Sequence, residues 1–226
     1  MSRYTEISQF RKSSDTITNW VYYPIASYLC VLFSFTAITP NQITFLAILS
    51  ELSAIYFIIT GFESNLIIIV VLLQLGWLFD LMDGMMARYK KLGFYHLINP
   101  SIKGYYLDAI SDHALKFMIL GALIYQFALQ NESGWLIGLI AIIIHGITQT
   151  EHTLRKLILK SRTKLGQEPK SQPTIAEHII LIMNNIYLFY LVFIVINRID
   201  LLLVTFAGAE LILLIKRVCQ FWQLKP

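Results

Sequence analysis

The stretch "NLIIIVVLLQLGWLFDLMDGMMAR" (65–88) joins a long apolar run to two aspartates and a closing arginine. A second acidic stretch, "GYYLDAISDHALK" (104–116), stands directly before another apolar run. An ionised side chain near the hydrocarbon of a membrane costs about 2.5–3.5 kcal/mol on insertion scales, so such residues are rare there and usually functional. The two stretches nevertheless contain four of them: Asp80, Asp83, Asp108 and Asp112.

The composition is that of a membrane protein. Of the 226 residues, 56% are hydrophobic and only 14% are charged, and the mean hydropathy is +0.61, whereas soluble domains carry about 25% charged residues. Because a span needs about 20 apolar residues, the sequence predicts an all-α, polytopic protein with six transmembrane helices. The expected spans are 42–60, 65–82, 117–129 with a polar start at 105, 134–149, 176–197 and 199–215.

The segment before the first span, 24–38, is too short to cross a membrane and ends near Pro40. Together with "TNWVYY" (18–23) it predicts an amphipathic helix lying at the interface. We therefore expect a single membrane domain over 1–226, with a cytoplasmic or interfacial part at 1–38 and a six-helix core at 39–218. Two cysteines are too few for a disulfide framework, and the polar N-terminus lacks the apolar region of a signal peptide.

All but two of the lysines and arginines, Lys116 and Arg198, fall on one side of this arrangement. Of the 18 in the chain, three precede the first span, four lie between spans two and three, six between spans four and five, and three at the C-terminus. The positive-inside rule then puts both termini and the acidic segments on the cytoplasmic side of the cell (inner) membrane.

Helical spacing gathers the charges of the first acidic stretch on one face. Offsets of three, four, seven and eight residues recur on one side of a helix. The residues on that side are Asp80, Asp83, Gly84, Ala87 and Arg88. The small residues could leave room for a ligand near the backbone or permit tight helix packing.

Asp108 and Asp112, four residues apart, also share a face, at the matching end of the next span. All four carboxylates can therefore converge, and they would repel one another unless a cation held them. Oxygen ligands of this kind suit Mg²⁺ or Mn²⁺. The alternative is a set of ordinary cap and loop charges, or ion pairs with Arg88 and Lys116.

These residues resemble the signature of the CDP-alcohol phosphotransferase (CDP-alcohol phosphatidyltransferase) family, D-x-x-D-G-x-x-A-R followed by G-x-x-x-D-x-x-x-D. "DLMDGMMAR" (80–88) and "GYYLDAISD" (104–112) match all its fixed positions, and "TPNQIT" (39–44) is similar to the family's P-N-x-x-T. The gap between the two halves, 89–103, has fifteen residues where the family usually has seven or eight. We interpret it as an enlarged cytoplasmic loop, with Pro100 preventing a continued helix.

The resemblance implies a two-metal centre of Mg²⁺ or Mn²⁺ held by the four aspartates, with Asp112 also acting as general base. The metals would bind the diphosphate of a CDP-linked donor. It implies a nucleotide and substrate pocket formed by Thr44, Gly84, Ala87, Arg88 and Gly104. It further implies a CDP-linked donor, an alcohol acceptor, membrane lipids and a second copy of the chain as partners, and no nucleic acid.

The acceptor site is less defined by the sequence. Lys116 is expected chiefly as the ion-pair partner of Asp112, and Arg155 and Arg162 either bind a phosphorylated acceptor or are ordinary positive-inside charges. Glu51 and Asn184–Asn185 are candidates to line the acceptor cavity, or to join helices or protomers.

The leading hypothesis is therefore an integral-membrane transferase in phospholipid synthesis. It would move a substituted phosphate from CDP-diacylglycerol to a small polar alcohol and release CMP. An alternative has a CDP-choline or CDP-ethanolamine donor and a lipid alcohol acceptor. An alternative of another class is a cation- or proton-coupled transporter, which would predict broken helices and an internal repeat; neither is visible.

Overall fold

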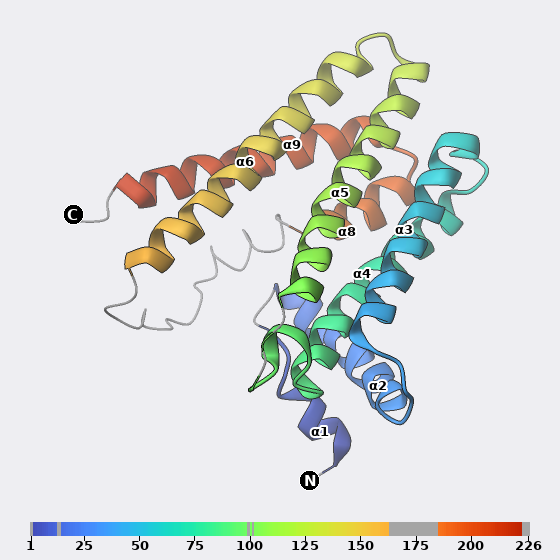
Figure 1. Ribbon diagram of the computed structural model, residues 1–226. Coiled ribbons are helices and arrows are strands. Elements are labelled where there is room, and N and C mark those ends of the chain that lie inside the picture. The colour runs from blue at the N-terminus through green and yellow to red at the C-terminus, as the bar shows by residue number, and fades with distance from the viewer. Residues whose placement is uncertain (1, 13–14, 99, 101, 163–184, 223–226) are drawn as a thin grey trace.

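A computed structural model describes residues 2–12, 15–98, 100, 102–162 and 185–222. Within these ranges every regular element is helical, which confirms the all-α prediction (Figure 1). The α-helices are α1 (Arg3–Ser8), α2 (Tyr23–Ser34), α3 (Pro40–Gly61), α4 (Leu66–Tyr89), α5 (Lys103–Gln130), α6 (Gly134–Arg162), α8 (Ile186–Phe189) and α9 (Ile199–Trp222). Two short π-helical segments, η1 (Thr18–Tyr22) and η4 (Tyr190–Ile194), and one 3₁₀ turn, η2 (Gly93–Tyr95), complete the set.

Helix α3 begins where its sequence provides a capping box. The Thr39 side chain accepts a hydrogen bond from the backbone of Gln42, and the Gln42 side chain accepts one from the backbone of Thr39. Pro40 occupies the first helical position, where its missing N–H costs nothing. The start of α3, and hence the position of every side chain on it, is therefore fixed locally.

Helices α3 and α4 form an antiparallel hairpin. The turn between them is stabilised by Asn65, whose side chain donates to the carbonyl of Gly61 at 2.7 Å. Further along, the Ser50 hydroxyl donates to the carbonyl of Leu72 at 2.8 Å. These two bonds fix the register between the two helices.

The long connection between α4 and α5 is a loop, as its length and Pro100 predicted. Helix α4 ends at Tyr89, and the chain reverses through Lys91 and Gly93, which have φ values of 50° and 60°. Only the short turn η2 interrupts the described part of this loop. The two halves of the acidic signature thus lie on separate, regular helices.

Two apolar clusters join the helices. The larger one unites α3, α4, α5, η4 and α9 through buried residues that include Ile58, Leu73, Ile119, Leu123, Tyr190, Leu203 and Phe206. The smaller one fixes the N-terminal segment against α3 and α4 through Ile7, Tyr23, Ala26, Cys30, Ile43, Met82, Met85 and Met86. Helices α6 and α9 pack on each other, and α1 and α2 lie at the opposite end of the molecule from the turn between α5 and α6 (Figure 1).

Residues 18–34, where the sequence predicts an interfacial helix, are helical as η1 followed by α2, and their position at a membrane interface stays a prediction. One side of it is buried in the smaller cluster, whereas Trp20, Tyr28 and Leu32 on its other side are exposed. The structure thus gives this segment an apolar outer face.

In the part of the chain that the structure describes, three helices are long and apolar enough to cross a membrane. They are Pro40–Gly61, Leu66–Tyr95 and Gly134–Arg155. Helices α5 and α9 are 28 and 24 residues long but are not among them. The first part of the expected fifth span, 176–184, falls outside the described residues, so the number six stays a prediction.

Candidate active site

Three of the four signature aspartates converge. Asp80 and Asp83 extend from α4 and Asp108 from α5, and one carboxylate oxygen of each lies within 4.8 Å of the other two. Asp83 is buried, and the other two are half-buried. Three like charges at this separation repel strongly in a poorly hydrated site, so the arrangement is suited to bind a cation through hard oxygen ligands. Among the described residues, this is the grouping of side chains that could hold a metal ion.

Thr44 on α3 fixes the orientation of one of these carboxylates. Its hydroxyl donates to Oδ2 of Asp83 at 2.5 Å, and both side chains are buried. Because α3 starts at a defined residue, the hydroxyl is held one turn inside the helix, opposite α4. The P-N-x-x-T segment thus belongs to the same site as the acids.

Gly104 allows the start of α5 to approach the start of α3. A Cβ atom at this position would lie 2.9 Å from Oδ1 of Asn41. The glycine of the second half-signature therefore leaves room for the Asn41 side chain beside the site.

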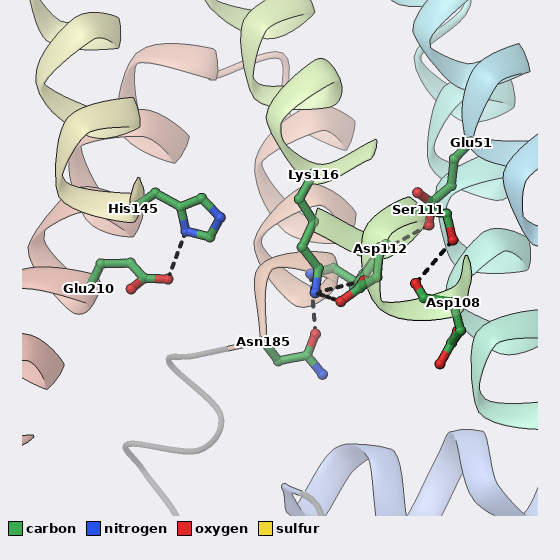
Figure 2. A network of polar contacts seen from close by, with 9 residues as sticks. Glu51, Asp108, Ser111, Asp112, Lys116, His145, Asn185 and Glu210 are labelled. Atoms are coloured by element: carbon green, nitrogen blue, oxygen red, sulfur yellow. Dashed lines mark hydrogen bonds and ion pairs between the residues drawn. The ribbon is translucent and has the colours of Figure 1, made fainter. Parts of the chain in front are cut away.

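Asp112 has a different partner from the other three acids. Nζ of Lys116 contacts both of its carboxylate oxygens, at 2.8 and 2.9 Å (Figure 2). The predicted ion pair between residues four apart on one helix is confirmed. A carboxylate bonded through both oxygens to an ammonium group is held in one orientation.

The four aspartates line one small cavity. Its interior volume is about 10 Å³, room for about one water molecule. Its walls come from α3, α4, α5 and α8 and consist of Thr44, Ala47, Ile48, Glu51, Asp80, Asp83, Asp108, Ser111, Asp112, Leu115 and Tyr187.

Glu51 and Tyr187 add two polar groups to this cavity. The Tyr187 hydroxyl donates to Oε1 of Glu51 at 2.7 Å, and both residues are buried. Glu51 was a candidate from the sequence, whereas Tyr187 was not. The one feature of the sequence that could have indicated Tyr187 is its position: a tyrosine close to Asn185 within an apolar stretch.

Arg88 points toward the N-terminal segment. Its Nε donates to the backbone carbonyl of Phe10 at 2.8 Å, and its Nη1 lies 3.3 Å from the place where a Cβ of residue 84 would be. Gly84 therefore accommodates the guanidinium group of Arg88, one turn along the same helix. Ala87 is half-buried on the same stripe.

Asn185 connects the N-terminal segment to α8. Its side-chain amide donates to Oδ2 of Asp15 at 3.1 Å and to the hydroxyl of Thr18 at 3.2 Å. Asn185 also points toward Lys116 in Figure 2. The sequence suggested a cavity-lining or helix-joining role for this residue, and the structure gives it a joining contact.

Arg155, one of the basic residues proposed from the sequence for an acceptor, does not line this cavity. Arg155 is half-buried and lines a separate groove along α6, together with Glu151 and Leu154. The side chain of Arg162 lies outside the described residues. On α6 and α9, a buried pair of His145 and Glu210, 3.2 Å apart, also lies away from the acids (Figure 2).

The comparison with known protein families agrees with this geometry. The sequence model described as CDP-alcohol phosphatidyltransferase matches residues 37–207, a range that contains the cavity-lining residues named above. No individual curated protein gives a significant match to the chain.

Proposed function

The chain belongs to the CDP-alcohol phosphatidyltransferase family, and from that premise we propose that it transfers a substituted phosphate from a CDP-linked donor to an alcohol, releasing CMP. The observation that carries the proposal is the cluster of Asp80, Asp83 and Asp108 at the centre of the family signature. The cavity places in one site the carboxylates that could hold cations and a carboxylate that could accept a proton. This combination fits phosphoryl transfer.

The donor set fits Mg²⁺ or Mn²⁺, because its close-lying ligand atoms are all carboxylate oxygens. We propose that Asp80, Asp83, Asp108 and Asp112 hold two such ions. Bound there, divalent ions would neutralise the donor diphosphate and the charge that develops on the departing CMP.

The protein side chains would then position the reactants. Thr44 orients Asp83, and Lys116 orients Asp112. The acceptor oxygen attacks the phosphorus that carries the donor's alcohol, and a new P–O bond forms. The P–O bond to CMP breaks, its electron pair leaves with CMP, and the acceptor proton passes to the Asp112 carboxylate.

We propose that the cytidine nucleotide lies against the stripe of α4 that carries Gly84 and Ala87. Arg88 and Gly104 would complete that side of the pocket. The bond from Arg88 to the carbonyl of Phe10 holds the guanidinium group over Gly84, where its free N–H groups would face a bound phosphate.

The first choice of donor is CDP-diacylglycerol, with a small polar alcohol as acceptor in phospholipid synthesis. CDP-choline or CDP-ethanolamine with a lipid alcohol is the alternative, since both reactions release CMP and need the same acids. The family match disfavours a cation-coupled transporter.

We further propose six transmembrane spans, an interfacial N-terminal helix, and cytoplasmic termini and active site in the cell (inner) membrane. The one-sided distribution of lysine and arginine supports this topology. A homodimer is proposed from the family resemblance.

The test is an assay of CMP release from the purified full-length protein in lipid nanodiscs. Labelled CDP-diacylglycerol or CDP-choline is incubated with Mn²⁺ and a panel of alcohols, including diacylglycerol. We expect CMP from one donor and its loss in Asp83→Asn. The absence of CMP with every donor, together with unchanged Mn²⁺ binding in Asp83→Asn, would overturn the proposal.

A further inference from the structure

Glu51 is a fifth carboxylate in the cavity and has no role in the reaction described above. It lies two turns further along α3 than Thr44 and is only 3% exposed. The cavity brings it together with Asp80 and Asp112. A buried acidic residue within a candidate membrane span is costly to retain, and such residues usually mark a substrate or ion site.

The surroundings of Glu51 hold it in one conformation. Tyr187 donates to Oε1, its ring stacks on Trp77 with centroids 4.7 Å apart, and its backbone carbonyl accepts a hydrogen bond from Gln74 at 2.8 Å. On α4, a Cβ at Gly76 would lie 2.5 Å from Cγ of Glu51, so the glycine makes room for this side chain. A side chain fixed from several helices is preorganised in the way that binding sites require.

The charges of the cavity indicate what Glu51 could bind. Five carboxylates line it, and Lys116 is the cation in contact with one of them. Two divalent ions held by the four aspartates would leave Glu51 as a further carboxylate in the wall. A cationic alcohol fits beside this carboxylate, whereas a phosphorylated alcohol would be repelled by it.

We infer that Glu51, with Tyr187, binds the ammonium group of an amino alcohol whose oxygen lies beside Asp112. The inference rests on the proposed function, since it names the alcohol of that reaction. Oε1 of Glu51 is held by Tyr187, which leaves Oε2 for the ligand. Oε2 accepts a hydrogen bond from a primary ammonium group or lies against a quaternary ammonium group, and the Tyr187 ring provides a further contact. The amino alcohol is either the free acceptor or the alcohol part of a CDP-linked donor.

Direct binding tests the inference without turnover. Thermal unfolding of the purified protein with Mn²⁺ and CDP is followed while choline, ethanolamine, glycerol or glycerol 3-phosphate is titrated. We expect stabilisation by the two amines at concentrations at least tenfold below those needed for the other two. Glu51→Gln should abolish that preference while its amide oxygen still accepts from Tyr187, and stabilisation by CDP should be unchanged.

Glu210→Gln is the matched control, because Glu210 is equally buried but lies on α9 outside the cavity. If Glu51→Gln does not fold, Tyr187→Phe provides the test. It removes one hydrogen bond, worth about 0.5–1.5 kcal/mol, and should weaken amine binding about 2- to 12-fold. The inference is overturned if the folded Glu51 or Tyr187 variant binds the amines as tightly as the wild type does. It is also overturned if the wild type binds amines and glycerol equally well.

Turnover then distinguishes the two sources of the amine. One arm supplies CDP-diacylglycerol with choline or ethanolamine, and the other supplies CDP-choline or CDP-ethanolamine with diacylglycerol. In the productive arm, Glu51→Gln should raise KM for the amine-bearing substrate at least tenfold and leave KM for the other substrate unchanged. If the protein binds amines but releases CMP in neither arm, the proposed function is contradicted and the amine site is not. If CMP is released but Glu51→Gln does not change the KM of the amine-bearing substrate, the amine site is contradicted and the proposed function is not.

Discussion

Replacing Thr44 by valine isolates the contribution of one hydroxyl to the metal-binding acids. Valine has nearly the same shape as threonine, so the packing between α3 and α4 is preserved while the 2.5 Å bond to Asp83 is lost. A hydrogen bond to a charged group is worth about 1.5–3 kcal/mol. If this bond stabilises the reactive arrangement in full, kcat/KM should fall about 10- to 150-fold.

The assay is CMP release measured over a range of Mn²⁺ concentrations. Because Thr44 acts by orienting Asp83, we expect the Mn²⁺ concentration for half-maximal activity to rise in Thr44→Val. Thr44→Ser, which keeps the hydroxyl, should restore most of the activity.

Thr60→Val is the matched control. Thr60 is on the same helix and donates to the carbonyl four residues earlier at 2.8 Å, as Thr44 does at 3.2 Å, but it contacts no carboxylate in the described residues. Equal activity and equal Mn²⁺ dependence in the two valine variants would refute the assignment of Thr44 to the site.

Three further predictions concern the same cavity. Lys116→Met leaves Asp112 without its ion-pair partner and should lower kcat at least tenfold with little change in donor KM, as measured by steady-state CMP release. Lys116→Arg keeps a positive charge and should retain more activity. Equal loss of kcat in both variants would contradict an ion-pairing role. Gly76→Ala places a methyl group 2.5 Å from Cγ of Glu51 and should lower the free energy of unfolding by about 1–3 kcal/mol. Gly208→Ala is the control, because no atom lies within 4 Å of the new Cβ, and it should not lower the free energy of unfolding. Removal of divalent ions with EDTA should abolish CMP release, and Mn²⁺ or Mg²⁺ should restore it; full activity in EDTA would contradict a metal-dependent reaction.

Much of the site could be predicted from the sequence because its spacing is helical. Asp80 and Asp83 lie three residues apart on one helix, and the ion pair of Asp112 with Lys116 needs only a spacing of four. The fifteen-residue gap with Pro100 was also readable as a break between helices. These features depend on one helix at a time.

The remaining features depend on how helices are rotated and placed against one another. Nothing local to Arg88 indicates that it bonds the carbonyl of Phe10, and nothing near Tyr187 indicates that its hydroxyl reaches Glu51. Periodicity likewise placed Gly84 on the acid stripe without showing that the Arg88 side chain lies against it. Such contacts are set by packing across the two apolar clusters.

The bonds from Asn185 to Asp15 and Thr18 have a consequence for biosynthesis. The first of them joins residues 170 positions apart, and a ribosome adds about 5–20 residues per second. Roughly 8 to 34 s therefore pass between synthesis of the N-terminal segment and synthesis of its partner. The part of the protein that is made first obtains its last contacts only when the chain is nearly complete.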